Sequence, residues 1–276
     1  MKSKITLSLI FIFSVMGSFA QNAIVGPGFS SGWGACGYNT DFSYLSAGTG
    51  SSYILTKVAN GTGSQYFRIG LDYGSTKGQY NTLGGGPDVQ VSSNTEYNLN
   101  STCTTTGAMY FNVTSTSHNY IFKTKDLSAT PSFKLIIFEV EGTVQNVTGV
   151  NKDLSTIYPG QAVTVTATLS GSFSTGQGVY LRYTNDNFAT STIAEMTGSG
   201  TSYTASIPSG TNSASKTVNY YVFTSGNGLT ISVANADWYT INLNNNAGPN
   251  YSYTVNSSWN TTSNGNWSST STWAGG

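Results

Sequence analysis

Charged residues are scarce in this sequence. Only 8% of its 276 residues are charged, with 11 Lys and Arg against 11 Asp and Glu. A nucleic-acid-binding protein needs a positive field to neutralise phosphates. A protein that adsorbs to anionic membrane surfaces needs a basic patch. We therefore expect no nucleic-acid partner and no polybasic contact with a membrane.

Histidine and cysteine are nearly absent as well. His118 is the single histidine, and the cysteines are Cys36 and Cys103. These residues lack the spacing of a zinc site, so we expect neither a metal ion nor another cofactor. An even number of cysteines in an exported chain favours a Cys36–Cys103 disulfide. Two buried thiols are the alternative, because a disulfide also requires the two Cα atoms to lie close together.

The one sustained hydrophobic run lies at the N-terminus. Lys2 and Lys4 precede the apolar stretch Ile5–Val15, and small residues lead to Ala20, as in a signal peptide. The run of about 11 residues is too short to span a bilayer, which needs about 20. We predict cleavage after Ala20, a secreted or cell-surface location and no membrane insertion. Without the two lysines the net charge becomes −2.

Glycine and β-forming residues are abundant, with 32 Gly and 18 Tyr in the chain. Val, Ile, Thr, Tyr and Phe favour strands, and the glycines suit tight turns. We predict an all-β protein with two antiparallel β-sandwich domains in tandem after a signal peptide. The expected parts are a signal peptide (residues 1–20), an N-terminal β-sandwich (residues 21–144), an immunoglobulin-like β-sandwich (residues 145–245), and a linker with the start of a further, truncated module (residues 246–276).

Alternation of apolar and polar residues, interrupted by turn signals, locates the strands. In the N-terminal part we expect strands at Ser52–Val58, Ser64–Leu71, Glu96–Leu99, Ala108–Val113, Asn119–Lys125 and Phe133–Val140. In the second part we expect them at Ala162–Leu169, Gly178–Thr184, Ser202–Ile207, Thr217–Thr224 and Trp238–Leu243. In the expected strand Ala162–Leu169, apolar residues alternate with threonine with a period of two. This alternation predicts an inward face made of Val163, Val165, Ala167 and Leu169.

Four stretches of the second part resemble immunoglobulin-like modules of exported Bacteroidetes surface proteins, and also starch-binding carbohydrate-binding modules. They are Tyr180–Phe188, Ala194–Met196, Tyr203–Pro208 and Val218–Ser225. The resemblance implies a sandwich fold and a polysaccharide or cell-surface glycan as partner. The tail Gly265–Gly276 resembles the opening of a β-helix-type repeat from the same phylum, which implies a truncated chain.

Sugar recognition needs flat aromatic rings and a few amide or carboxylate groups rather than net charge. The candidate ligand-binding residues combine these groups on predicted strands and turns: Trp33, Tyr38, Tyr66, Arg68, Tyr73, Tyr180, Arg182, Asn185 and Asn187. In the alternative interpretation the rings pack inside the cores and the asparagines only form a turn.

Catalytic signatures are weak. Glu139 and Glu141 lie two residues apart on one strand face, at the end of the predicted strand Phe133–Val140, but an outward charged face on an edge strand explains them better than a glycosidase pair. His118 is the only base for a triad, and the chain has no Gly-x-Ser-x-Gly elbow. We expect a non-catalytic surface protein that binds polysaccharide or acts as an adhesin module. The alternatives are a structural spacer that presents a missing C-terminal domain and a part of a secreted glycoside hydrolase.

Overall fold

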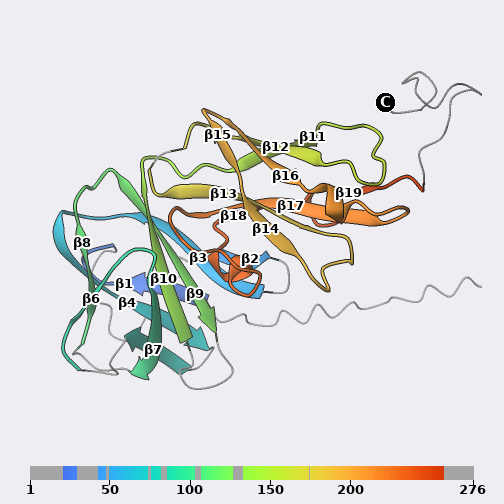
Figure 1. The fold of residues 1–276 in the computed structure, drawn as a ribbon. Helices are drawn as coiled ribbons and strands as arrows, with labels where there is room; N and C mark the ends of the chain where they lie inside the picture. Colours follow the sequence, from blue (N-terminus) through green and yellow to red (C-terminus); the bar gives the residue numbers. More distant parts are fainter. Residues whose placement is uncertain are drawn as a thin grey trace, which may run out of the picture.

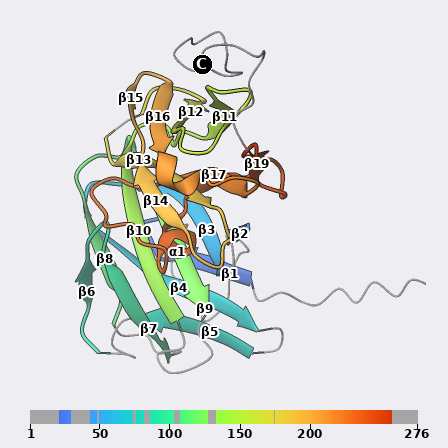
Figure 2. The same ribbon diagram turned by 45° about the vertical axis from the view of Figure 1, so that its right-hand side comes forward.

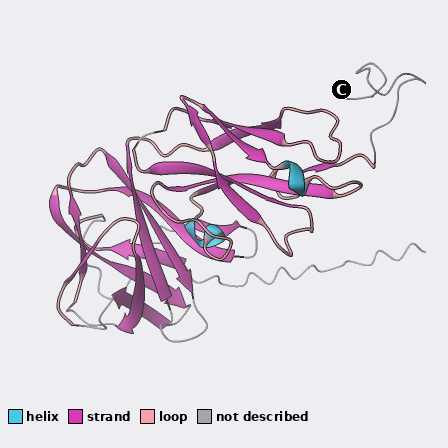
Figure 3. Ribbon diagram, in the orientation of Figure 1, coloured by secondary structure: helices cyan, strands magenta, loops and turns pink. Residues whose placement is uncertain are grey.

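The computed structural model describes residues 21–29, 43–47, 50–73, 76–81, 86–102, 107–126, 133–173 and 175–257. Within these residues the protein is all-β, as predicted, and helix is limited to two short turns (Figure 3). The strands form two groups along the chain, which we call the N-terminal sheet region (residues 21–141) and the C-terminal sheet region (residues 147–257) (Figure 1). The predicted signal peptide and residues 258–276 lie outside the described part.

The N-terminal sheet region contains one ten-stranded sheet with the order β2-β3-β9-β10-β7-β5-β4-β8-β6, and β1 pairs with β4. All its pairings are antiparallel except that of β6 with β8. Its strands are β1 (Gln21–Val25), β2 (Ser43–Ala47), β3 (Gly50–Val58), β4 (Gly63–Tyr73), β5 (Thr76–Asn81), β6 (Val89–Val91), β7 (Glu96–Thr102), β8 (Met109–Val113), β9 (His118–Asp126) and β10 (Phe133–Glu141).

This sheet folds back on itself. In the strand order β4 and β9 are separated by β10, β7 and β5, yet Phe67 of β4 meets Phe122 of β9 edge to face, with ring centroids 5.2 Å apart. The two stretches lie one over the other in Figure 2. Phe67, Phe122, Ile69, Leu135 and Ile137 are all buried in the enclosed core. Each buried aromatic or aliphatic side chain of this size contributes about 1.5–3 kcal/mol.

The C-terminal sheet region contains two sheets. One has the order β11-β12-β16-β15, and the other has the order β14-β13-β17-β18 with β19 also paired to β17. Their strands are β11 (Val147–Lys152), β12 (Val163–Leu169), β13 (Gln177–Thr184), β14 (Thr192–Glu195), β15 (Thr197–Ser199), β16 (Ser202–Ile207), β17 (Thr217–Gly226), β18 (Asn242–Asn244) and β19 (Tyr251–Thr254). A 3-10 turn, η1 (Ser209–Thr211), precedes β17.

The alternation of apolar and polar residues along β12 determines which side chains enter the core between these two sheets. The predicted inward residues of β12 are all buried: Val163, Val165, Ala167 and Leu169. They share one hydrophobic cluster with Leu181 of β13. Every residue of β13 is buried, so both faces of this strand are covered. The pairing of β19 with β17 continues the sheet beyond residue 245, where the sequence analysis places a linker.

The chain between β17 and β18 forms a short helix rather than a continuous strand. The expected strand at Trp238–Leu243 is wrong in its first four residues, because Trp238 and Tyr239 belong to α1 (Ala236–Tyr239) and β18 begins only at Asn242. Trp and Tyr favour strands in isolation, but local hydrogen bonds close a helical turn here. The Ser232 N–H donates to Asn235 Oδ1 (2.7 Å), and the Thr240 hydroxyl donates to the Ala236 carbonyl (2.8 Å).

We call the contact between α1 and the outer face of β9 and β10 the junction. Its hydrophobic cluster contains Ile121 of β9, Ile136 and Phe138 of β10, and Trp238 and Ile241 from the α1 segment. Alternate residues of β9 and β10 therefore face either the N-terminal core or the junction. In Figure 2, α1 lies over the β3 and β9 side of the sheet.

The interpretation of β10 as an edge strand is wrong for Phe133–Ile136, which pair with β7 on one side and with β9 on the other. Glu139 and Glu141 lie beyond the pairing with β7. Further along, the Glu141 N–H donates to the Thr175 carbonyl of the C-terminal sheet region (2.9 Å). The strand is thus covered at Glu141 by a segment that is distant in the sequence.

Candidate functional site

Two tyrosines lie side by side on the outer face of the N-terminal sheet. Gln90 of β6 is in register with Tyr110 of β8, which is in register with Tyr66 of β4. Phe67 and Met109 are fully buried, so alternation turns Tyr66 and Tyr110 outward. Their ring centroids are 5.2 Å apart with planes inclined by 39°.

Polar side chains surround the two rings. We call the set Ser64, Tyr66, Gln90, Tyr110 and Asn112 the tyrosine face. The Ser64 hydroxyl donates to Asn112 Oδ1 (3.0 Å), and the Tyr110 hydroxyl contacts Gln90 Oε1 at 3.5 Å. The side-chain amides of Gln90 and Asn112 accept these hydrogen bonds through oxygen, which leaves their NH₂ groups available as donors. Apolar ring faces beside amide donors match the apolar faces and hydroxyls of a sugar.

The backbone of Tyr66 is held by a close glycine contact. The Gly28 N–H donates to the Tyr66 carbonyl (3.0 Å). A Cβ at Gly28 would lie 2.7 Å from the Gln65 carbonyl carbon, so only glycine permits this approach. The tyrosine face is therefore built on a strand that is supported by pairing and by this loop.

Arg68 follows Tyr66 by two residues on β4 and is only 7% exposed. Burial lowers the pKa of its guanidinium, and the negative charge of Asp88 partly offsets that effect. Asp88 also accepts a hydrogen bond from the Ala108 N–H (2.8 Å), at the start of β8. Of the predicted ligand-binding residues, the structure thus places Tyr66 on the tyrosine face and Arg68 buried beside it.

Tyr180 and Arg182 lie in a buried layer rather than on a surface. Tyr180 is 3% exposed and stacks on Phe223 with centroids 5.5 Å apart. Burial, followed by the charge of Glu195, raises the pKa of Tyr180 to about 12. Arg182 donates to Tyr221 Oη (3.0 Å) and to Asp237 Oδ1 (3.1 Å).

Asn185 and Asn187 form the turn after β13. Asn185 Nδ2 donates to the Thr211 carbonyl (2.8 Å), and Asn187 has a φ of 57°. Between them Asp186 accepts hydrogen bonds from Thr184 and Thr190, which lower its pKa to about 2. These contacts serve the turn.

The remaining predicted residues lie wholly or partly outside the part of the chain that the structure describes. Trp33, Tyr38, Cys36 and Cys103 lie outside the described residues, so the disulfide stays a prediction. Tyr73 ends β4, but its side chain is outside the described part.

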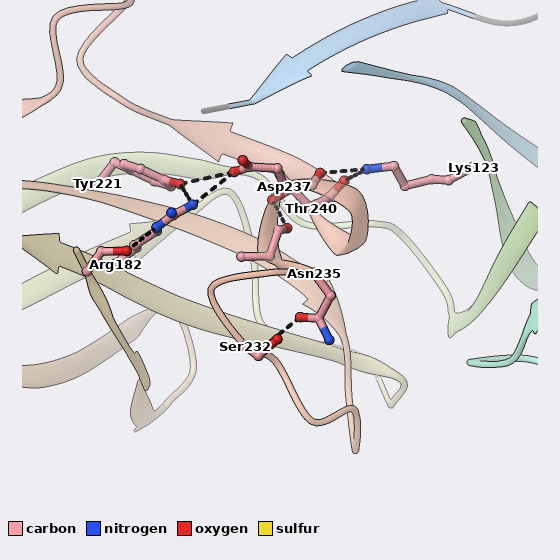
Figure 4. A network of polar contacts seen from close by, with 9 residues as sticks. Lys123, Arg182, Tyr221, Ser232, Asn235, Asp237 and Thr240 are labelled. Carbon is pink, nitrogen blue, oxygen red and sulfur yellow. Dashed lines mark hydrogen bonds and ion pairs between the residues drawn. The ribbon is translucent and has the colours of Figure 1, made fainter. Parts of the chain in front are cut away.

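A polar network crosses the junction, and sequence reasoning missed it. Lys123 of β9 is 0% exposed. Its Nζ donates to the carbonyls of Thr240 and Asp237 and lies 5.7 Å from the Trp238 ring centroid. Figure 4 shows the chain of contacts running from Lys123 through the α1 turn to Asp237 and on to Arg182. Burial lowers the pKa of Lys123 to about 7, and the charge of Asp237 acts in the opposite direction.

Glu96 of β7 binds two side chains of α1 at the junction. Its Oε1 accepts hydrogen bonds from Trp238 Nε1 (3.2 Å) and Tyr239 Oη (2.8 Å), and its Oε2 pairs with Lys134 Nζ (2.8 Å). Burial alone would raise the pKa of Glu96, but the hydrogen bonds from Lys134, Tyr239 and Trp238 and the positive charge of Lys134 lower it overall. The carboxylate thus stays charged while it binds α1.

His118 and Glu139 form the one histidine–carboxylate pair in the described residues, at 2.8 Å from Nδ1 to Oε1. Tyr120 Oη donates to the same oxygen (3.0 Å). Such a pair could orient a general base. Within the described part of the chain, however, no hydrogen bond joins His118 to a serine or threonine hydroxyl. Glu141, two residues on, is exposed.

Comparison with protein-family models, with curated proteins and with solved structures finds no match to this chain. Over the residues that the structure describes, no helix has the length and apolar character needed to cross a bilayer. In the same residues, no three His, Cys, Asp or Glu side chains gather where a metal ion could bind. The tyrosine face is therefore the candidate site that rests on geometry and sequence together.

Proposed function

We propose that the protein is a non-catalytic, exported surface module that binds neutral polysaccharide through the tyrosine face. The observation that carries this proposal is the outward pair of Tyr66 and Tyr110 rings, 5.2 Å apart. Stacking on such rings needs no charge, which agrees with a chain in which 8% of residues are charged. The amide groups of Gln90 and Asn112 would orient sugar hydroxyls.

The proposal includes the finer architecture expected from the sequence. We infer that the C-terminal sheet region is an immunoglobulin-like β-sandwich and that the N-terminal sheet region is a second sandwich. Support comes from two separate buried clusters, one with Phe67 and Leu135, the other with Val165 and Leu181. The resemblance to exported surface proteins supports secretion after removal of residues 1–20.

A structural spacer is the second candidate, and the junction favours it. Trp238 is 6% exposed and bonds to Glu96, and Lys123 is fully buried against the α1 turn. Such contacts make the two sheet regions resist bending, as a projecting stalk requires. The two functions are compatible, because the tyrosine face lies on β4, β6 and β8 and the junction on β9 and β10.

Replacement of both Tyr66 and Tyr110 by alanine should weaken polysaccharide binding by about thirtyfold or more, since truncation of even one central aromatic contact costs about 2 kcal/mol. The wild-type chain is first screened on a glycan array, and the best ligand is then titrated calorimetrically against wild type and variant. Thermal unfolding of each variant shows whether the fold is kept.

The matched control is the double Tyr66→Phe, Tyr110→Phe variant. It keeps both rings and removes only the hydroxyls, so ring stacking predicts nearly unchanged affinity. Full binding by a folded double-alanine variant would contradict the assignment of the tyrosine face. A wild-type chain that binds no glycan on the array would contradict sugar binding altogether and leave the spacer function.

A further inference from the structure

Asn227 and Gly228 form an exposed Asn-Gly turn directly after β17. The Asn227 N–H donates to the Gly176 carbonyl (2.8 Å), which holds the turn against the residue that precedes β13. Asn227 also lines a groove of about 390 Å³ at the start of β13, together with Gln177 and Gly178. Water therefore reaches both residues of the turn.

The backbone nitrogen of Gly228 lies next to the side-chain amide of Asn227. Its N–H donates to Asn227 Oδ1 at 2.8 Å, and Oδ1 is bonded directly to the electrophilic carbon Cγ. Gly228 has a φ of 76°, and a Cβ built on it would meet no atom of the described residues within 4 Å. Because glycine has no side chain to clash, its nitrogen can approach Cγ, and such proximity lowers the barrier of an intramolecular reaction.

A side chain of the N-terminal sheet region contacts the peptide group between Asn227 and Gly228. Asn94, in the turn between β6 and β7, donates from Nδ2 to the Asn227 carbonyl oxygen (3.0 Å). Its own N–H donates to the Ile137 carbonyl of β10 (2.8 Å), which fixes this turn. When the Gly228 nitrogen loses its proton, amide resonance spreads the negative charge onto the Asn227 carbonyl oxygen. A donor placed where charge develops stabilises that charge, so Asn94 favours the reactive form of the nitrogen.

We propose that Asn227–Gly228 is a self-modifying site, at which the protein deamidates without an enzyme. The Gly228 nitrogen gives its proton to water or hydroxide and forms a bond to Asn227 Cγ. The bond from Cγ to Nδ2 then breaks, and the amide nitrogen takes up a proton and leaves as ammonia, which leaves a succinimide ring. Water opens this ring at either of its carbonyls and yields aspartate or isoaspartate, with no oxidation or reduction.

The modification falls at a contact between the two sheet regions. Asn94 belongs to the N-terminal sheet region and Asn227 to the C-terminal one, and the two residues share a hydrogen bond. Either product places a negative charge at this contact. Isoaspartate also lengthens the main chain between β17 and α1, the segment that packs at the junction.

A second Asn-Gly pair, Asn60-Gly61 between β3 and β4, offers an internal comparison. Its amide is held through the NH₂ group, which donates to the Pro27 carbonyl (2.8 Å), so departure of ammonia there also breaks a hydrogen bond. The third pair, Asn264-Gly265, lies outside the described residues. We expect Asn227 to deamidate about tenfold faster than Asn60 in the folded chain, because one hydrogen bond to a developing charge contributes a factor of this size.

The whole chain is incubated at mildly alkaline pH in water enriched in heavy oxygen, and the conversion of each asparagine is followed by peptide mass spectrometry. The same incubation in urea removes the fold, and the rates at Asn227 and Asn60 should then converge. Asn94→Gly should slow the reaction of Asn227 about tenfold in the folded chain and leave it unchanged in urea. Glycine accepts the φ of 58° at this position. Ser93→Gly adds a glycine to the same turn but keeps the Asn94 amide, so this matched control should react as wild type.

Conversion of Asn227 no faster than that of Asn60 in the folded chain would overturn the proposal. A rate difference that persists in urea would overturn it too, because the difference would then come from the neighbouring sequence and not from the fold. An unchanged rate in folded Asn94→Gly would overturn the role of Asn94. Thermal unfolding shows whether each variant is folded, and the comparison of Asn227 with Asn60 in the wild-type chain needs no variant. No glycan enters these measurements, so their result is independent of the tyrosine face.

Discussion

Replacement of Trp238 by alanine should lower the free energy of unfolding by about 3–5 kcal/mol, the range for truncation of a buried large aromatic side chain. Trp238 is 6% exposed and packs in the cluster of Ile121, Ile136 and Phe138. It also lies over Lys123 and donates its indole N–H to Glu96. Its loss therefore leaves a cavity and weakens two buried polar contacts at once.

The effect should concentrate at the junction, so the two sheet regions should separate before either unfolds. Chemical denaturation followed by far-ultraviolet circular dichroism and by fluorescence would then give two transitions, and small-angle scattering would show a more extended particle. Trp238→Phe is the matched control. It keeps a ring in the cluster but removes the N–H that binds Glu96, and it should cost about 1–2 kcal/mol.

A single unchanged transition in Trp238→Ala would contradict this account. It would mean that the cluster is stable without its largest member and that contacts elsewhere hold the regions together. One such contact is the close approach at Gly226, where a Cβ would meet Phe138 Cδ1 at 2.6 Å. The hydrogen bond from Asn94 Nδ2 to the Asn227 carbonyl (3.0 Å) is another.

The free energy of unfolding should rise between about pH 7 and pH 10 because of Lys123. Burial lowers the pKa of this ammonium from 10.5 to about 7. In that pH window the unfolded chain binds a proton that the folded chain does not, so stability increases with pH. The slope from this one group reaches about 1.4 kcal/mol per pH unit. Below about pH 7, Lys123 is protonated in both the folded and the unfolded chain, so the full cost of burying its positive charge lowers the stability of the fold.

The measurement compares wild type with Lys123→Met by urea denaturation at several pH values. Methionine fills much of the same volume without a titratable group, so wild type should gain stability relative to Lys123→Met as the pH rises from about 7 to about 10. The lost hydrogen bonds to the Thr240 and Asp237 carbonyls give an offset that does not depend on pH. Parallel stability curves for the two proteins would contradict a lowered pKa.

The strands were the most predictable part of the fold. Alternation along Val163–Leu169 gives the buried face of β12 directly, because side chains point to opposite faces with a period of two. The same argument assigns Tyr66 to a face opposite Phe67. The run Leu135–Phe138 is hydrophobic without alternation, a pattern typical of a strand that is covered on both faces. That signal could have indicated the junction, but it does not say what covers the second face.

The candidate sites were less predictable. Tyr66 and Tyr180 are both tyrosines on alternating strands, yet Tyr66 is half-buried on an open face and Tyr180 is 3% exposed beneath the α1 segment. Local pattern is the same for both residues. The groove at the start of β13 is harder still to predict, because its lining residues come from separate elements and no motif joins them.

The all-β composition, the main strands and the inward residues of β12 follow from local sequence patterns, because each depends on neighbours along the chain. The position of α1 on the outer face of β9 and β10 follows only from long-range packing, and so does the burial of Lys123 beneath residues more than a hundred positions away. Periodicity gives the direction of a side chain, whereas its exposure and charge state depend on the distant segment that packs against it.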